Sequence, residues 1–328
     1  MLYNKYGDTM NKRILSKLNK VAILYNIGQI KSYEEQNGTQ NKTYKVTSND
    51  KEYIIKEFSK DAINNSYSLS KRKEQLRISF ELNKKNISCI TPLKIKNKYF
   101  RLFDKHYYLV YDYSEYKSIE VKELSNEHII SLATLQAKLH KLNIKTKLPC
   151  TYKKIDIDFN NMIKKYKNEP DVYKVLLKNK DIMIEFINKS NSYLKDMKQN
   201  LCLSHNDYKT HNILWNNLTP VLIDFDAIGK VNPTCALCES AYTFSKLNKK
   251  FDLDRYKLYL ETYISNSNKI KDDFQKALYV SMNGKLRWYN YLLSKKDLYG
   301  VVSMTNDFVN YYKNIEKFND IYQNIKRS

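Results

Sequence analysis

Three side chains in one short stretch of the chain are of the types that phosphoryl transfer uses. Asp207 and Asn212 are five positions apart, and Asp224 follows twelve positions later. One carboxylate can orient the hydroxyl of an acceptor, while an amide oxygen and a second carboxylate can bind Mg²⁺, which prefers hard oxygen ligands. The pattern therefore indicates a reaction that asks the protein for positioning and charge neutralisation rather than for covalent chemistry.

The local sequence predicts how these side chains are held. A polar loop, His205–His211, precedes two strand-like pieces, Asn212–Trp215 and Pro220–Phe225. Short runs rich in β-branched and aromatic residues, bounded by polar residues, are typical of strands. We therefore expect Asp207 in the loop and the two candidate metal ligands in the strands that follow it.

A β-rich region lies before these residues. Thr43–Thr47 and Glu52–Phe58 flank the turn residues Ser48–Lys51, which predicts a hairpin. In its second strand Lys56 shares a face with Ile54, because side chains alternate across a strand. Helices are expected on either side of the hairpin, with short strands after the second helix: residues 9–25 and 68–85, then 92–103 and 107–113.

The chain is mostly helical after residue 113. A leucine stripe runs from Leu132 to Leu142, with Ser125 as a candidate N-cap, and helical spacing continues over 157–199 and after the β-rich stretch. The aromatic cluster at residues 288–291 is expected in the core. We predict an α+β chain with a small β-rich lobe, residues 1–113, and a larger helical lobe, residues 114–328.

The loop and hairpin resemble the catalytic and metal-binding loops of the aminoglycoside phosphotransferase and choline kinase superfamily, relatives of the protein kinases. The similarity lies in His205-x-Asp207-x-x-x-x-Asn212 followed by Ile223-Asp224-Phe225-Asp226. It implies a two-lobed protein-kinase-like fold. It also implies that Asp207 is the catalytic base, that Asn212 and Asp224 bind magnesium, and that His205 supports the loop.

The resemblance extends to the nucleotide-binding lobe, over roughly residues 30–245. Lys56 is similar to the lysine that pairs with the ATP phosphates, and Glu74 to the glutamate that holds it, with Glu81 as a rival. Val110–Tyr113 resembles the hinge, which implies that Tyr111 and Tyr113 contact the nucleotide. Residues 37–46 resemble the phosphate-covering turn, with one glycine, Gly38.

The chain departs from the family pattern in three places. Asn206 stands where glycine is frequent after the loop histidine, and Asp226 stands where many protein kinases have glycine. No acid follows Pro233 before Glu239, although a structural aspartate commonly follows a proline there. The role of Asp226 stays open, and these departures leave the three catalytic candidates in place.

Composition limits the possible partners. Lys and Arg number 57 against 35 Asp and Glu, a net charge of +22, which by itself would suggest a polyanion. However, Lys, Asn, Ile and Tyr share AT-rich codons, and a biased genome explains their abundance. Only seven of the cations are Arg, the residue whose forked geometry suits nucleic acid. We expect no specific nucleic-acid partner.

Cysteine usage and the N-terminal sequence indicate a location inside the cell. Five cysteines at irregular spacing argue for a reduced, cytoplasmic protein, and the single Cys235-x-x-Cys238 lacks the second pair of a zinc site. Lys and Asn interrupt every apolar stretch near the N-terminus, so we expect neither a signal peptide nor a membrane partner.

These observations favour an ATP- and Mg²⁺-dependent kinase that phosphorylates a hydroxyl of a small polar molecule. Within the superfamily an aminoglycoside-type antibiotic is the first candidate acceptor, and a choline-, sugar- or methylthioribose-like metabolite is the alternative. A non-catalytic kinase-like scaffold, such as a spore-coat protein, is a further alternative, although retention of Asp207, Asn212 and Asp224 argues against it. The choice between ATP and GTP and the oligomeric state are open.

Overall fold

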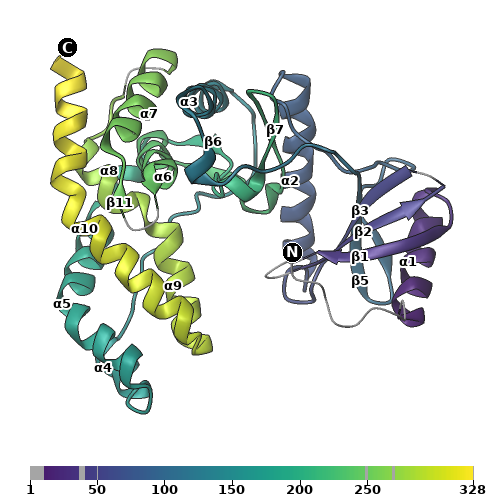
Figure 1. Cartoon of the computed structure of the whole chain (residues 1–328), viewed down its shortest axis with the longest axis horizontal. Helices are drawn as coiled ribbons and strands as arrows, with labels where there is room; N and C mark the ends of the chain where they lie inside the picture. The colour runs from purple at the N-terminus through teal and green to yellow at the C-terminus, as the bar shows by residue number, and fades with distance from the viewer. Residues whose placement is uncertain (1–10, 37–40, 50, 248–249, 268–269, 328) are drawn as a thin grey trace. The chain divides into compact units, whose positions relative to one another are not determined.

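The chain folds into two compact units. The computed structural model describes residues 11–36, 41–49, 51–247, 250–267 and 270–327 (Figure 1). One unit comprises Met1–Lys117 and Val221–Asp226, and the other comprises Ser118–Pro220 and Ala227–Ser328. The segment with Asp224 therefore belongs to the first unit, although it follows the start of the second unit in the chain. The division into a nucleotide-binding lobe and a catalytic lobe at residue 113 stays a prediction.

The first unit is built on an antiparallel sheet, five-stranded in its described part, with strand order β1-β2-β3-β5-β4. Its strands are β1 (Ile30–Gln36), β2 (Lys42–Ser48), β3 (Lys51–Glu57), β4 (Arg101–Phe103) and β5 (His106–Asp112). The expected hairpin is β2 and β3, in which Thr43 lies opposite Lys56. Alternation along β3 and its register with β5 place Ile54, Lys56, Leu109 and Tyr111 on one face.

One helix covers each face of this sheet (Figure 1). Helix α1 (Lys12–Tyr25) begins at its N-cap Asn11 and packs Leu18 and Val21 against Tyr44 and Ile55. Helix α2 (Ser66–Lys84) packs Leu76 with Phe58 and Leu109 on the opposite face. Since Lys56 lies on that opposite face, α2 is the helix whose polar side chains can reach it.

The second unit is mainly helical. Helix α3 begins at Ser125, which caps it as expected: its hydroxyl accepts a hydrogen bond from the His128 amide. The helices and 3₁₀ turns of the described chain here are η1 (Val121–Glu123), α3 (Asn126–Lys141), α4 (Phe159–Lys165), α5 (Pro170–Tyr193), η2 (Asp196–Lys198), η3 (Thr210–Asn212), α6 (Pro233–Ser245), α7 (Leu253–Asn266), α8 (Phe274–Ser281), α9 (Asn283–Lys295) and α10 (Leu298–Arg327). The 3₁₀ turn η4 (Phe225–Ala227) begins in the first unit and ends at the residue where the second unit resumes. Helix α10 runs alongside α5, α8 and α9 (Figure 1). Within the part that the structure describes, no helix has both the length and the apolar character needed to cross a bilayer.

Short strands connect these helices. They are β6 (Cys202–Ser204), β7 (Ile213–Asn216), β8 (Thr219–Leu222), β9 (Gly229–Val231), β10 (Lys246–Leu247) and β11 (Lys250–Phe251). Strand β6 pairs with β9, β7 with β8, and β10 with β11. The expected strand Pro220–Phe225 is too long by three residues, because the backbone at Asp224 takes a left-handed conformation, φ 58°, which ends the extended run.

The aromatic cluster on α9 is only partly in the core. Tyr289 is fully buried and donates or accepts a hydrogen bond with Thr305 at 2.8 Å. Trp288 and Tyr291 are 38% and 46% exposed and stack on each other, with ring centroids 5.0 Å apart. The expectation of a buried cluster is therefore right for Tyr289 and wrong for its two neighbours, since residues three apart on a helix share a face and Tyr289 points elsewhere.

Candidate active site

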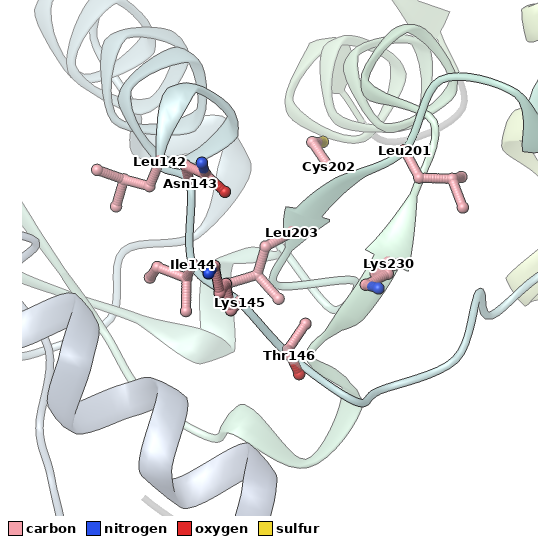
Figure 2. A pocket seen from close by; sticks show the side chains of 9 residues that line it. All are labelled: Leu142, Asn143, Ile144, Lys145, Thr146, Leu201, Cys202, Leu203 and Lys230. Atoms are coloured by element: carbon pink, nitrogen blue, oxygen red, sulfur yellow. The ribbon is translucent and has the colours of Figure 1, made fainter.

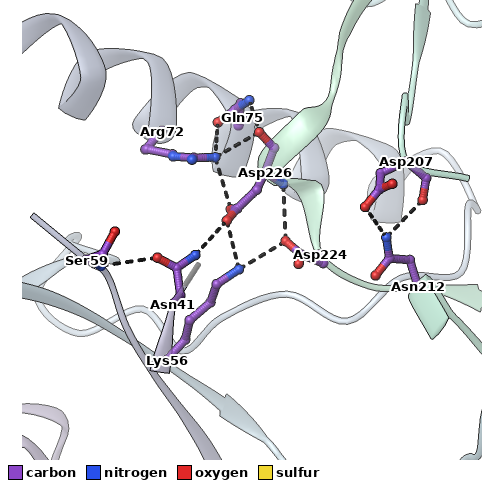
Figure 3. Close-up of polar contacts among 9 residues, drawn as sticks. All are labelled: Asn41, Lys56, Ser59, Arg72, Gln75, Asp207, Asn212, Asp224 and Asp226. Carbon is purple, nitrogen blue, oxygen red and sulfur yellow. Dashed lines mark hydrogen bonds and ion pairs between the residues drawn. The ribbon is translucent and has the colours of Figure 1, made fainter. Parts of the chain in front are cut away.

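In the first unit the site centres on Lys56, which is only 9% exposed. Its Nζ donates to Asp224 Oδ1 at 3.0 Å and to Asp226 Oδ2 at 2.8 Å (Figure 3). A buried ammonium needs such partners, because an unpaired charge away from water is costly. The strand lysine and the candidate metal ligand Asp224 are thus brought together, and Asp226 joins them.

Side chains of α2 hold the segment that carries the two carboxylates. The Asp226 carbonyl oxygen accepts from Arg72 Nη1 at 2.8 Å and from Gln75 Nε2 at 2.7 Å (Figure 3). The Arg72 guanidinium also lies 3.3 Å from the Asp226 carboxylate. On the other side Asn41 Nδ2 donates to Asp226 Oδ2 at 3.4 Å. Asp226 is therefore a structural centre of this unit, which gives the position left open by the sequence a definite role in holding the loop.

The electrostatics of this group favour the charged form of Lys56. Burial by itself lowers the pKa of Lys56, but Asp226 and Asp224 outweigh it and raise the pKa above its ordinary value. Burial raises the pKa of the nearby Tyr111 phenol, while Lys56 acts in the opposite direction. Lys56 is thus held in its charged form on this face of the sheet.

Glu74 has a different partner in this structure. It lies on α2, as expected, and accepts from Arg77 Nε at 2.8 Å and from Arg77 Nη2 at 2.9 Å. The rival Glu81 pairs with Lys84 at 3.1 Å. The carboxylates on Lys56 are instead Asp224 and Asp226, so the pairing of Lys56 with either glutamate stays a prediction.

The expected hinge lies at the end of β5. Tyr111 shares a face with Lys56, and the Tyr113 amide donates to the Glu52 carbonyl oxygen at 3.1 Å. The Tyr113 ring is 37% exposed and lies 3.9 Å, centroid to Nζ, from Lys45. Nucleotide contact by Tyr111 and Tyr113 stays a prediction. In the expected phosphate-covering turn, residues 37–40, including Gly38, lie outside the described residues.

In the second unit the site centres on Asp207, in the loop after β6. Asn212 Nδ2 donates to the Asp207 carbonyl oxygen at 2.9 Å and to Asp207 Oδ2 at 2.6 Å (Figure 3). Lys209 Nζ lies 2.7 Å from Asp207 Oδ1. Asp207 thus keeps an exposed, oriented carboxylate, and Asn212, which is 4% exposed, is fixed by it. That Asp207, Asn212 and Asp224 act on one nucleotide-bound cation stays a prediction.

The loop that carries Asp207 is anchored on both sides of this residue. Asn206 takes a left-handed backbone, φ 61°, and its Nδ2 donates to the Ala227 carbonyl oxygen at 3.1 Å. Asparagine tolerates this conformation better than most residues, which explains how it replaces the glycine expected there. Tyr208 donates to the Leu132 carbonyl oxygen at 3.0 Å, and His205 is 1% exposed. The supporting role expected of His205 stays a prediction.

A cavity of about 360 Å³ in the second unit lies close to this loop in sequence but does not contain it. Figure 2 shows its lining from the segment after α3 and from β6 and β9, with Asn143, Lys145, Cys202 and Lys230 among the side chains. Neither Asp207 nor Asn212 lines it. The candidate site is therefore defined by the geometry of its side chains and not by this cavity.

The sequence did not single out four of the side chains that hold the site: Asn41, Arg72, Gln75 and Lys209. A signal existed for two of them. Arg72 and Gln75 are three positions apart on the helix where Glu74 was considered, so they share one face of it. Helical periodicity alone does not say which face of that helix meets Lys56.

A small antiparallel sheet with a buried lysine, followed by a helical unit with an acid-bearing loop, is the architecture of the kinase-like phosphotransferases, so the expected fold class is confirmed. The chain belongs to the phosphotransferase enzyme family, whose model matches residues 36–247. The resemblance drawn from the catalytic motifs is thereby confirmed, and the chain is a small-molecule phosphotransferase with a hydroxyl acceptor. No curated protein sequence matches the chain.

Solved structures with this fold cover nearly the whole chain. Spectinomycin phosphotransferase APH(9)-Ia, in complex with ADP and spectinomycin, has a TM-score of 0.66 at 15% identity, covering 94% of this chain and 98% of its own. The amicoumacin kinase hAmiN, in complex with AMP-PNP, Ca²⁺ and Ami, has a TM-score of 0.63 at 16% identity, with 94% and 96% covered. Plasmodium vivax ethanolamine kinase has a TM-score of 0.57 at 15% identity, with 97% and 93% covered. At these identities the similarity establishes the fold.

Proposed function

We propose that this protein transfers the γ-phosphate of ATP to a hydroxyl group of a small polar molecule, with Asp207 as the base. The observation that carries the proposal is the fixed geometry of the Asp207 carboxylate, which accepts from Asn212 at 2.6 Å and pairs with Lys209 at 2.7 Å. In the proposed reaction Asp207 accepts the proton of the acceptor hydroxyl. The acceptor oxygen forms a bond to the γ-phosphorus as the bond to ADP breaks.

Lys56 is the proposed phosphate ligand in the first unit. It is a buried cation on the α2 face of the sheet, and the carboxylates that hold it are those of the metal-binding segment. Arg72 and Gln75 keep that segment in place through the Asp226 carbonyl oxygen. Nucleotide binding by Lys56, Tyr111 and Tyr113 is supported by nucleotide complexes of two proteins with the same fold.

The donor set fits a magnesium ion. Asn212 uses both hydrogens of its amide nitrogen on Asp207, which leaves its oxygen Oδ1 as the atom able to bind a cation. Asp224 supplies a carboxylate, and an amide oxygen with a carboxylate is a sufficient protein set when phosphate oxygens and water complete the octahedron. Bound there, Mg²⁺ would neutralise charge on the transferring phosphate. A Ca²⁺ ion accompanies AMP-PNP in the amicoumacin kinase structure.

Two acceptor classes have support. An aminoglycoside-type or related antibiotic is the first candidate from the sequence, and two proteins of the same fold are a spectinomycin phosphotransferase and an amicoumacin kinase. A small metabolite is the second candidate, since an ethanolamine kinase also shares the fold. The scaffold alternative is disfavoured, because Asp207, Asn212 and Asp224 are all retained.

Mg·ATP turnover over a panel of hydroxyl acceptors tests the proposal. We expect Asp207→Ala to lower kcat by about 10² to 10⁴, the contribution of a positioned base. Asp181→Ala is the matched control, because Asp181 lies exposed on α5. If the wild type and Asp207→Ala consumed ATP equally slowly with every acceptor, the non-catalytic scaffold would be the better description.

A further inference from the structure

Helix α6 places a carboxylate beside the catalytic loop. The Phe244 ring of this helix packs edge-on against Tyr208, with centroids 5.5 Å apart, and Tyr208 follows Asp207 in the chain. Glu239, on the same helix, is half-buried and interacts electrostatically with Asp207. Burial raises the pKa of Glu239. The positive charge of Lys285 lowers this pKa, and the negative charge of Asp207 raises it further. The surroundings of Asp207 thus include a second acid and its cationic partners.

Helix α9 supplies those cations. Lys285 Nζ donates to Thr243 Oγ1 at 3.4 Å, and Thr243 lies one turn after Glu239 on α6. The same Nζ lies 4.9 Å from the centroid of the Tyr242 ring. The start of α9 is fixed, because the fully buried Asn283 bonds both main-chain groups of Lys153, at 3.2 and 2.8 Å. Lys285 is therefore held near Glu239 by a rigid helix.

Two more cations belong to this group. Arg287, exposed on α9, interacts electrostatically with Glu239. Lys209 pairs with Asp207 at 2.7 Å and also acts on Glu239. The electrostatic partners of Glu239 thus include three cations, Lys285, Lys209 and Arg287, and one acid, Asp207. This group of five side chains carries three positive and two negative charges. The local balance is positive.

Four other acids of the C-terminal region make structural contacts. Asp252 caps α7 and Asp273 caps α8, each accepting a main-chain amide of its own first turn. Asp272 accepts from Thr234 Oγ1 at 2.9 Å and from Asn200 Nδ2 at 3.2 Å, and Glu261 lies 3.7 Å from Lys257. The contacts described for these four acids are caps and local pairs and include none with Asp207, so they give no support to an acidic pocket for a polycationic drug.

We propose that the acceptor carries a carboxylate or phosphate group as well as its hydroxyl, and that Lys285 and Arg287 bind this anionic group while Asp207 orients the hydroxyl. The inference rests on the proposed kinase function and narrows its substrate class. The surplus positive charge near Asp207 would repel a polycation and attract an anion. Contacts between like charges are a strong means of rejecting a ligand. Polycationic aminoglycosides are therefore disfavoured within the antibiotic class.

Four small acceptors of similar size test this charge preference. They are glycerate, an anion; serine, a zwitterion; glycerol, which is neutral; and ethanolamine, a cation. For each we would measure kcat/KM or, where no phosphate is transferred, its inhibition constant against Mg·ATP hydrolysis. We expect the wild type to favour glycerate over ethanolamine by about tenfold or more, the equivalent of one partly desolvated charge pair.

Charge reversal separates the proposed residues from their neighbours. Lys285→Glu and Arg287→Glu should each reduce the ratio of glycerate to ethanolamine affinity by about tenfold. Lys295→Glu, at the exposed end of the same helix beside Tyr291, should leave it unchanged. Lys285→Met serves as a second variant with less risk to folding, and it should reduce the ratio by a smaller factor.

Two sets of results would contradict the proposals, one for the anionic acceptor and one for the kinase function. Equal affinity for all four compounds, a preference for ethanolamine in the wild type, or ratios unaffected by both reversals would overturn the anionic acceptor while leaving the kinase function standing. Absence of any Asp207-dependent ATP consumption, with water or with any acceptor, would overturn the kinase function itself. The two failures are therefore distinguished by the Asp207→Ala comparison.

Discussion

At the scale of single residues, Lys56 is a buried ammonium group that is paired with two carboxylates. Its Nζ lies 3.0 Å from Asp224 Oδ1 and 2.8 Å from Asp226 Oδ2, so two carboxylates compensate one buried ammonium. In the proposed function the surplus negative charge of this trio would favour a divalent cation at Asp224, and Lys56 would bind a phosphate oxygen. The same trio explains why Lys56 stands out in a chain with so many exposed lysines.

Replacing Lys56 tests this role. We expect Lys56→Met to raise the KM for ATP by about 10- to 100-fold, because a charge-assisted hydrogen bond contributes about 1.5–3 kcal/mol. Lys56→Arg, which keeps the charge, should lose less. The matched control is Lys51→Met on the same strand, where Lys51 pairs with Asp112 at 2.7 Å and its side chain is 59% exposed.

Steady-state kinetics with varied ATP provide the measurement, and a thermal melt without nucleotide separates binding from folding. Removing Lys56 leaves Asp224 and Asp226 facing each other, so a modest loss of stability is expected as well. If Lys51→Met and Lys56→Met raised the KM for ATP equally, ATP binding would depend on the net charge of the protein and not on Lys56. The proposed role of Lys56 would then be wrong.

At the scale of elements, α2 contacts the segment that carries Asp224 and Asp226 through Gln75 and Arg72. Gln75 is 2% exposed, and its Nε2 donates to the Asp226 carbonyl oxygen at 2.7 Å. We expect Gln75→Ala to lower kcat about tenfold and to raise the Mg²⁺ concentration needed for half activity, since losing one buried hydrogen bond costs about 1–2 kcal/mol. A magnesium titration of the turnover rate measures both effects.

The neighbouring Glu74→Gln variant makes this comparison sharper. Glu74 binds Arg77 through two hydrogen bonds, at 2.8 and 2.9 Å. If that pairing persists during catalysis, Glu74→Gln leaves the KM for ATP within about twofold of wild type, as expected for a half-exposed pair. If Glu74 instead moves to Lys56 when nucleotide binds, Glu74→Gln should resemble Lys56→Met.

These contacts show how far the sequence determines the site. The spacing of Asp207, Asn212 and Asp224 indicated phosphoryl transfer, whereas the nucleotide role of Lys56 came from the family resemblance. The structure pairs Lys56 with Asp224 and Asn212 with Asp207, and the roles of these residues stay predictions. The rotation of α2 about its axis was not predictable, because residues of several types recur on each of its faces. Strand β1 was not assigned because its sequence, IKSYEEQ, is mostly polar, and β10 and β11 are too short to show alternation.

Histidine 140 joins three elements of the second unit. It lies on α3, and its Nδ1 and Nε2 bond the Tyr263 hydroxyl of α7 at 2.7 Å and the Ser204 hydroxyl of β6 at 3.1 Å. Burial of the ring lowers the pKa of His140 to about 3. The folded protein therefore holds this imidazole neutral.

Acid should weaken the second unit through His140. Below the ordinary pKa of 6.5 the unfolded state binds a proton that the folded state does not, so the free energy of unfolding falls by up to about 1.4 kcal/mol per pH unit down to about pH 3. We expect His140→Asn to be less stable than the wild type at pH 7. Urea unfolding at pH 7 and pH 5 should show that the difference in the free energy of unfolding between the two proteins is smaller at pH 5. A difference in the free energy of unfolding that stays constant between pH 7 and pH 5 would contradict this account of His140.

At the scale of the whole molecule, the charge of +22 is spread over both units. Many lysines lie in local pairs, such as Lys17 with Glu57, Lys189 with Glu185 and Lys276 with Asp196. Pairs of this kind on the surface contribute little stability, but the unpaired remainder sets a positive potential around the protein. Such a potential attracts any polyanion and needs no dedicated site.

This potential predicts weak, sequence-independent binding to DNA at low salt. Each phosphate contact releases a counterion, so the logarithm of the affinity should fall linearly with the logarithm of salt concentration and be lost near about 0.2 M salt. Filter binding with two unrelated duplexes should give the same curve for the wild type and for Asp207→Ala. Retention of one duplex over the other at about 0.2 M salt would instead reveal base recognition, which the scarcity of Arg argues against.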